Sequence, residues 1–255
     1  MTSLPQAFLN LPIAHRALHD VADGRPENSR AAIRAAISAG YAIEMDLQLS
    51  RDGRAMVFHD YDLGRLTGQS GAVCQRDAAD LAAIPLRGGD EGIPSFAEVL
   101  DLVAGRVPLL VELKDQHGAM GETDGKLERA TALDLKGYQG DLALMSFNPS
   151  MVVELTKLAP DWPRGLVTCH YPEQDWPTIP EPVRAHLRGI PDYDRAGAVF
   201  LSHEVHDLHS PHVARLKAQG ARVLTWTVRS PAQEAEARKL ADNITFERYL
   251  AEFPT

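Results

Sequence analysis

Four segments between residues 13 and 60 decide the fold and the chemistry: I-A-H-R (Ile13–Arg16), P-E-N-S (Pro26–Ser29), I-E-M-D (Ile43–Asp46) and V-F-H-D (Val57–Asp60). They place two histidines and two carboxylates on or beside strand-like segments. Residues two apart in a strand share a face, so Glu44 and Asp46 should point to the same side. Burying both carboxylates costs several kcal/mol unless a cation or hydrogen-bond donors compensate. A bound metal ion is the simplest compensation.

The composition indicates an ordinary globular protein. The chain has 255 residues, of which 44% are hydrophobic and 24% charged, and this length suits a single α/β barrel domain over residues 1–255. A net charge of -9 disfavours a nucleic-acid binder, which needs basic surface to displace counterions. It is compatible with a small anionic substrate, because a few local Arg or Lys residues decide that binding. The sequence indicates no oligomeric state.

Two further features concern cellular location. Cys74 and Cys169 give neither a disulfide framework nor a zinc-binding spacing, so we expect free thiols. The N-terminal residues lack a leader-like pattern, and no apolar stretch has the length of a membrane span. We therefore expect a cytoplasmic protein without stable membrane insertion.

Strand-like and helix-like segments alternate along the chain, which is typical of βα units around a parallel sheet. We expect strands at residues 13–15, 42–49, 55–59, 109–114, 142–147, 165–169, 198–202, 222–228 and 244–246. We expect helices at residues 27–39, 95–104, 127–135, 149–158, 211–219 and 231–240. The pair 42–49 and 55–59 should form a hairpin, and the proline-rich residues 171–182 a loop packed by Trp176. Polar residues follow many of the strands, which favours a TIM (β/α)8 barrel.

On such a barrel, the polar residues at the strand ends converge at one mouth. The carboxylates of Glu44, Asp46 and Glu112 suit a hard cation with oxygen ligands, Mg²⁺ or Ca²⁺, better than zinc. His15 and His59 can supply a base and an acid near neutral pH. Arg16 and Lys114 can neutralise a phosphate group. Together these residues indicate phosphoryl chemistry.

The motifs named so far, with a D-G turn at residues 52–53, E-L-K (Glu112–Lys114) and W-T-V (Trp226–Val228), occur in the order seen in the glycerophosphodiester phosphodiesterase family. The sequence resembles that family over most of its length. The resemblance implies a TIM barrel and a divalent-metal-dependent hydrolysis of glycerophosphodiesters to glycerol 3-phosphate and an alcohol. It implies that the substrate's 2-hydroxyl attacks phosphorus and that water opens the resulting cyclic phosphate. The residues matching the family's catalytic pair, metal ligands and phosphate contacts are His15 and His59; Glu44, Asp46 and Glu112; and Arg16 and Lys114.

Several positions carry alternatives. Ala17 replaces the family's usual glycine, so its methyl group could narrow the site, and T-F-E (Thr245–Glu247) stands where many members have T-D. Phe147 and Trp226 could form an apolar wall for the substrate or pack only in the core. A set of histidines spaced three apart could bind a second metal, but a pocket-shaping loop is favoured because Pro211 interrupts any helix through it: His203, His206, His209 and His212.

Two rival functions share this barrel. One is a phospholipase-D-like enzyme that acts on lysophospholipids, or the same barrel catalysing a cyclising transfer without hydrolysis. A lipid substrate would need exposed apolar loops at the mouth, for which Tyr171 and Trp176 are candidates. The other is a non-catalytic barrel that binds a phosphoryl ligand without turnover, a hypothesis motivated by Ala17.

Overall fold

The computed structural model describes residues 2–254. In its sheet, strand β2 (Ala42–Leu49) pairs with three other strands. One edge of β2 pairs in parallel with β4 (Leu109–Leu113). The other edge pairs in parallel with β1 (Ile13–Ala14) and, farther along, in antiparallel with β3 (Ala55–Val57). The predicted hairpin is therefore confirmed, although β3 ends before His59.

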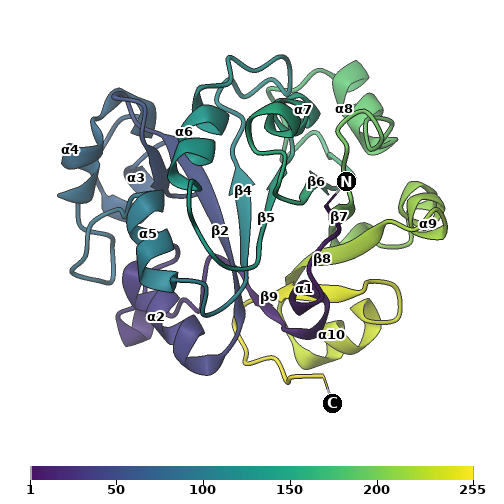
Figure 1. Ribbon diagram of the computed structural model, residues 1–255, viewed down its shortest axis with the longest axis horizontal. Helices are drawn as coiled ribbons and strands as arrows, with labels where there is room; N and C mark the ends of the chain where they lie inside the picture. Colours follow the sequence, from purple (N-terminus) through teal and green to yellow (C-terminus); the bar gives the residue numbers. More distant parts are fainter. Residues whose placement is uncertain (1, 255) are drawn as a thin grey trace.

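The sheet closes into a barrel of eight parallel strands (Figure 1). After β4 it continues through β5 (Leu142–Ser146), β6 (Arg164–Thr168), β7 (Phe200–Glu204), β8 (Arg222–Val228) and β9 (Asn243–Phe246). Strand β9 then pairs in parallel with β1, where Ile13 faces Thr245 and Ala14 faces Phe246. The predicted TIM barrel is confirmed, with β3 as an antiparallel addition.

Helices surround the barrel on its outer side (Figure 1). They are α2 (Arg30–Ala39), α5 (Phe96–Val103), α6 (Lys126–Asp134), α7 (Pro149–Leu158), α8 (Glu181–Arg188), α9 (Pro211–Ala218) and α10 (Pro231–Ala237). Shorter helices are α1 (Ala7–Asn10), α3 (Gly64–Thr67) and α4 (Ala78–Ala82). Within residues 2–254, no helix combines the length and the apolar composition that a membrane span requires.

Local sequence explains where several helices begin and end. Ser95 and Glu98 form the reciprocal capping box expected before α5, and Gly40 adopts the left-handed conformation that ends α2. The prediction that α2 starts at residue 27 is wrong, because Asn28 has a φ of 58° and leaves the helical path. Ser29 instead caps the helix by accepting a hydrogen bond from the Ala32 amide.

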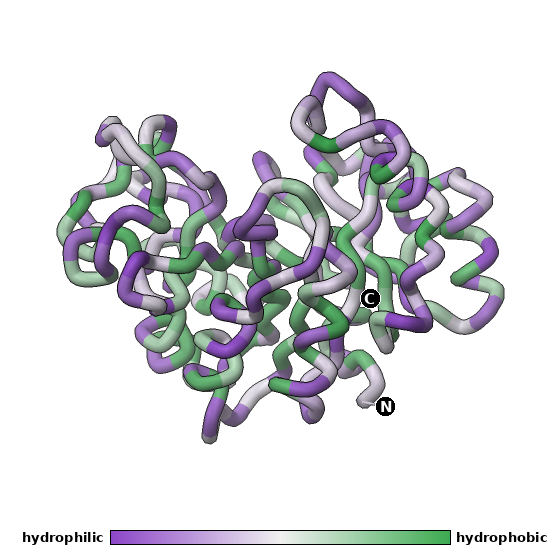
Figure 2. The backbone as a smooth tube through the Cα atoms, turned by 90° about the horizontal axis from the view of Figure 1, so that it is seen from above, coloured by the Kyte–Doolittle hydropathy of each residue, from purple (hydrophilic) through white to green (hydrophobic). Residues whose placement is uncertain are grey.

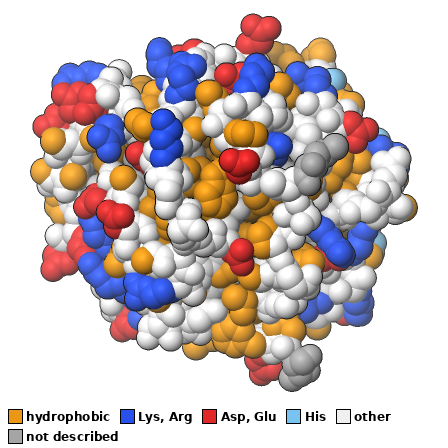
Figure 3. Space-filling view, viewed as in Figure 1, with side chains coloured by type: hydrophobic (Ala, Val, Ile, Leu, Met, Phe, Trp, Pro, Cys, Tyr) orange, Lys and Arg blue, Asp and Glu red, His pale blue; other side chains and the backbone are white. Residues whose placement is uncertain are grey.

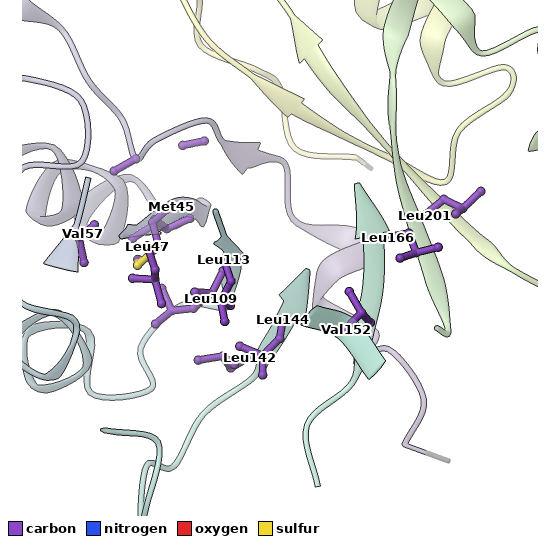
Figure 4. Close-up of a cluster of buried hydrophobic side chains, with 14 of the residues drawn as sticks. Met45, Leu47, Val57, Leu109, Leu113, Leu142, Leu144, Val152, Leu166 and Leu201 are labelled. Atoms are coloured by element: carbon purple, nitrogen blue, oxygen red, sulfur yellow. The ribbon is translucent and has the colours of Figure 1, made fainter. Parts of the chain in front are cut away.

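Hydrophobic side chains form one layer outside the sheet and a second layer inside the barrel. The outer layer fills the space between strands and helices, as the labelled residues of Figure 4 illustrate. Inside the barrel, Phe200 is fully buried and lies against Gly165, where an added Cβ would meet the Phe200 ring at 2.5 Å. Phe8 belongs to the inner layer, and Asn243 ties α1 to β9 by donating to the Phe8 carbonyl.

The loops at the periphery are mostly hydrophilic or neutral, whereas the hydrophobic stretches run through the interior (Figure 2). Acidic and basic side chains are interspersed on the face shown in Figure 3. No element was predicted for residues 60–93, yet they carry α3, α4 and, together with Phe58, a separate small core that packs on β3 around Leu81 and Ile93. This segment directly follows His59 in the sequence.

Candidate active site

The nine residues proposed from sequence line one cavity of about 140 Å³ at the carboxyl ends of the barrel strands. They are His15, Arg16, Glu44, Asp46, His59, Glu112, Lys114, Phe147 and Trp226. Parallel strands bring their carboxyl ends to one side of a barrel, so residues spread over most of the chain become neighbours. Their placement together is a finding, and their individual roles stay predictions.

Three carboxylates occupy one side of this cavity. Asp46 and Glu112 are register partners on β2 and β4, and Glu44 lies two residues before Asp46 on the same face. One oxygen from each of these three side chains lies within 4.8 Å of the others. Because all three residues are buried, their negative charges cannot be screened by bulk water.

Two cations and an amide offset part of this charge. The Lys114 ammonium lies 2.7 Å from Asp46 Oδ1 and 2.6 Å from Glu112 Oε1. Asn28 donates to Asp46 Oδ2 at 2.9 Å, and the Arg16 guanidinium lies 3.7 Å from the same oxygen. Asp46 is therefore the best compensated of the three carboxylates.

The pKa values follow this uneven compensation. Burial and the neighbouring charges of Asp46 and Glu112 raise the pKa of Glu44 well above its ordinary value. Burial would also raise the pKa of Asp46, but the charges of Lys114 and His59 outweigh it and hold that pKa well below its usual range. Burial lowers the pKa of Lys114, yet Asp46 and Glu112 outweigh burial and keep the ammonium protonated.

A divalent cation fits this donor set. Glu44 accepts a hydrogen bond from the Arg16 backbone amide at 2.9 Å, and His15 Nε2 lies 3.9 Å from it. When all three are ionised, the buried carboxylates outnumber the cations Lys114 and Arg16 by one charge, and all their donor atoms are oxygens, the ligands that Mg²⁺ and Ca²⁺ prefer. Glu44, Asp46 and Glu112 could thus hold a metal ion.

Each histidine of the cavity has a carboxylate on its Nδ1 atom. His15 Nδ1 lies 2.6 Å from Glu247 Oε2, and His59 Nδ1 lies 2.7 Å from Asp60 Oδ1. Burial lowers the pKa of His15 to about 4, although the hydrogen bond to Glu247 opposes this effect. This lowered pKa favours the neutral form of the His15 imidazole at pH 7.

A chain of ion pairs connects the His59 side of the cavity to Arg16. Arg65 donates to both oxygens of Asp60 and to both oxygens of Glu27. Glu27 in turn accepts from Arg16 Nη1 at 2.7 Å. The P-E-N-S motif therefore has three local tasks, since Glu27 holds Arg16, Asn28 holds Asp46 and Ser29 caps α2.

Aromatic side chains form the opposite wall. The Phe147 and Trp226 rings pack edge to face with centroids 5.6 Å apart. Trp176 packs on Phe147 at 5.0 Å, which agrees with the predicted role of this tryptophan in residues 171–182, although α8 already begins at Glu181. The half-buried Phe147 and Trp226 line the cavity, so the wall and core-packing interpretations both apply to them.

Sequence comparison decides the family. The sequence model of the Glycerophosphoryl diester phosphodiesterase family matches residues 15–244, from His15 to Ile244. The chain belongs to this family. It is 28% identical over 166 residues to a glycerophosphodiester phosphodiesterase of Caldanaerobacter subterraneus, covering 62% of this chain and 66% of the relative. A relative with the same name from Bacillus altitudinis is 27% identical over 172 residues, covering 61% and 67%. The chain thus matches about two thirds of each relative's length.

Solved structures of glycerophosphodiester phosphodiesterases share the fold. An Oleispira antarctica phosphodiesterase in complex with the product sn-glycerol-3-phosphate has a TM-score of 0.74 and 24% identity, with 93% of both chains covered. A Thermotoga maritima glycerophosphodiester phosphodiesterase has a TM-score of 0.67 and 18% identity, covering 92% of this chain and 94% of that one. These similarities support the barrel architecture.

Two departures from the family pattern can now be placed. Ala17 has a φ of 64° and is buried, but it lines a neighbouring cavity of about 500 Å³ and is absent from the lining of the catalytic cavity. Ala17 therefore does not line the candidate site directly, and the effect of its methyl group stays a prediction. Glu247, which follows β9 in the T-F-E sequence, is the partner of His15.

The repeated histidines of residues 203–212 do not form a metal site. Among residues 2–254, neither group of three potential metal ligands includes any of them. His203 is buried and bonded to Thr168 Oγ1 at 2.7 Å, with Asp207 on its other side, so it is a structural histidine. Cys74 and Cys169 are free thiols, as expected.

Several residues that support the candidate site were not predicted from the sequence. Arg229 follows W-T-V and lines the cavity, and Glu247, Asp60, Glu27 and Asn28 hold the predicted residues in place. Asp60 belongs to V-F-H-D and Asn28 to P-E-N-S, so these motifs could have indicated both residues. Glu247 stands in the T-F-E segment, but nothing local indicates its partner, because His15 lies 232 residues away.

Proposed function

We propose that this protein hydrolyses glycerophosphodiesters, releasing glycerol 3-phosphate and an alcohol. The observation that carries the proposal is the meeting of His15, His59, three carboxylates and two basic side chains in one cavity of a member of this family. The product found in the Oleispira antarctica phosphodiesterase supports the same substrate class.

The cationic side of the cavity would bind the phosphodiester. Lys114 uses two of its three ammonium donors on Asp46 and Glu112, which leaves a third for a phosphate oxygen. Arg16 contributes a second charge, and its buried Nε has no hydrogen-bond partner among residues 2–254. A divalent cation, Mg²⁺ or Ca²⁺, held by Glu44, Asp46 and Glu112 would supply further positive charge to polarise the substrate.

The other side of the cavity suits glycerol. Phe147 and Trp226 offer an apolar surface for its carbon atoms. Ser202 and Thr245 line the cavity, and their buried hydroxyl oxygens have no hydrogen-bond partner within residues 2–254. Buried hydroxyl groups without partners are costly, so hydroxyl groups of a bound substrate would satisfy them.

The two histidines would transfer the protons. One would deprotonate the substrate's 2-hydroxyl as it attacks phosphorus, and the other would protonate the departing alkoxide. The cyclic phosphate formed in this step would then be opened by water, with the histidines exchanging roles. Asp60 and Glu247 keep both imidazoles oriented during these steps by holding their Nδ1 atoms.

The test is release of glycerol 3-phosphate from glycerophosphocholine with Mg²⁺ or Ca²⁺, compared among wild type, His15→Ala and Glu44→Ala. We expect release by the wild type only with divalent metal. His15→Ala should lose about 100-fold or more, because acid–base catalysis contributes about 10²–10⁴-fold. Glu44→Ala should lose activity because it removes one of the three carboxylates that would hold the metal ion. A wild type inactive with every divalent ion would contradict the proposal. Lysophosphatidylcholine, used as the substrate in the same assay, tests the alternative that the enzyme acts on lysophospholipids. A cytoplasmic location and the absence of a nucleic-acid partner stay predictions.

A further inference from the structure

The contact between His15 and Glu247 joins the two ends of the barrel. His15 follows β1, Glu247 follows β9, and His15 Nδ1 lies 2.6 Å from Glu247 Oε2. The side chains are 12% and 8% exposed respectively, so water competes little for this hydrogen bond. A carboxylate can only accept, so the imidazole must carry its hydrogen on Nδ1 in this contact.

Glu247 is itself restrained from several sides. Arg229 Nε donates to Glu247 Oε1 at 2.7 Å, which leaves Oε2 for His15. The backbone amide of Glu247 donates to the Val228 carbonyl at 3.0 Å. The carboxylate therefore has a defined position before any substrate binds.

A metal ion is the competing interpretation of the same residues. Within residues 2–254, His15, His19 and Glu247 form one of two groups whose potential ligand atoms lie within 4.8 Å. However, His15 Nδ1 and Glu247 Oε2 are already at hydrogen-bond distance, while two ligands of one zinc ion, each about 2.0–2.2 Å from it, must stand farther apart. Arg229 also faces the carboxylate, so we interpret the contact as a hydrogen bond.

We propose that Glu247 is a positioning residue that holds His15 with its hydrogen on Nδ1 and the lone pair of Nε2 directed into the catalytic cavity. Nε2 then stands ready to take a proton from a substrate hydroxyl or from water. Without the carboxylate, the imidazole can rotate or exchange tautomers, and only part of the population stays competent. The catalytic consequence rests on the proposed hydrolysis, whereas the tautomer of His15 does not.

The test combines spectroscopy with kinetics on the full-length protein. The ¹⁵N signals of the His15 ring, identified by their loss in His15→Gln, report which nitrogen carries hydrogen. They are compared between wild type and Glu247→Gln, alongside kcat and KM for glycerophosphocholine. Glu204→Gln is the matched control, because Glu204 Oε2 lies 2.5 Å from His170 Nδ1 in a similar pair that does not line the catalytic cavity.

We expect hydrogen on Nδ1 of His15 in the wild type and a mixed or reversed tautomer in Glu247→Gln. The kcat of this variant should fall by about 10- to 100-fold, the range typical for loss of a partner that orients a functional histidine, with KM changed less than about threefold. Glu204→Gln should match the wild type in both measurements.

Hydrogen on Nε2 of wild-type His15 would overturn the inference, and this result needs no variant to fold. An unchanged kcat in an active Glu247→Gln protein, or an equal loss in Glu204→Gln, would overturn it as well. If the wild type does not hydrolyse glycerophosphocholine, the proposed function fails, and the tautomer measurement still decides whether Glu247 positions His15.

Discussion

Replacing Glu44 by glutamine should change the stability of the protein in opposite directions with and without divalent metal. The oxygens of Glu44, Asp46 and Glu112 lie within 4.8 Å of one another. At an effective dielectric constant of about 20, two unit charges at that distance repel by about 3.5 kcal/mol. Lys114 contacts Asp46 and Glu112 directly, so Glu44 is the least compensated member.

Protonation limits the penalty that Glu44 imposes. At pH 7, protonating a carboxyl group whose ordinary pKa is 4.5 costs about 3.4 kcal/mol. If charge repulsion in the folded protein exceeds this cost, Glu44 takes up a proton, so the penalty cannot rise above about 3.4 kcal/mol. Glutamine removes the penalty but weakens the hydrogen bond from the Arg16 amide by about 1 kcal/mol. We therefore expect Glu44→Gln to raise the free energy of unfolding of the metal-free protein by about 1–3 kcal/mol.

Metal should reverse this order. A ligand at 100 times its Kd stabilises the folded wild type by about 2.7 kcal/mol, and the variant loses one of three carboxylate ligands. Urea unfolding at pH 7, in EDTA and in Mg²⁺ or Ca²⁺, measures both effects. The control is Glu204→Gln, because Glu204 is half-buried, pairs with the more exposed His170 and does not line the cavity; this variant should shift stability by less than about 0.5 kcal/mol. A Glu44→Gln protein less stable than wild type in EDTA would refute the reasoning.

Three further substitutions test the packing and electrostatics of the fold. In Ala17→Gly, relief of the left-handed backbone, about 1 kcal/mol, and loss of a buried methyl group, about 0.8 kcal/mol, should nearly cancel; kcat/KM should stay within about threefold, and a gain of tenfold would show that the methyl group restricts the site. In Gly165→Ala, the new Cβ meets the buried Phe200 ring at 2.5 Å, so urea unfolding should show a loss of about 1–3 kcal/mol, part of which Phe200→Leu should recover. Glu128 is fully buried, and burial raises its pKa. The folded state therefore holds the proton of Glu128 more tightly than the unfolded state does. Its contribution to the free energy of unfolding should be fully present below pH 4.5, the ordinary pKa, and should be lost as pH rises through the folded-state pKa. Glu128→Gln should abolish this fall, by about 1.4 kcal/mol for each unit of elevation, and equal pH profiles of the two proteins in urea unfolding would exclude it.

The barrel could be predicted because its strands and helices carry strong local patterns. The predicted strand at residues 222–228 and the predicted helix at residues 149–158 coincide with β8 and α7. The elements that were missed are short or polar. α3 and α4 have four and five residues, too few to show a helical period, and the small core over β3 holds them in place.

The site could be predicted only as far as its residues stand in local motifs. Glu44 and Asp46 share a strand face, so spacing alone places them together. The arginine contacts at the mouth follow no such rule. Arg65, which holds Asp60, also reaches Glu27 across 38 residues, and Arg229 reaches Glu247 across 18. Such pairs depend on how the loops fold back over the mouth, and periodicity carries no information about that.

Closure of the barrel assembles the candidate active site as well as the sheet. β1 is two residues long and lies between β2 and β9. One of its two edges therefore pairs with β9, the last strand of the sheet. The same pairing brings Glu247 to His15, while β2 brings Glu44 within 3.9 Å of the other ring nitrogen. The position of His15 therefore depends on both neighbours of β1, because the carboxylate on each side of its ring comes from a different one.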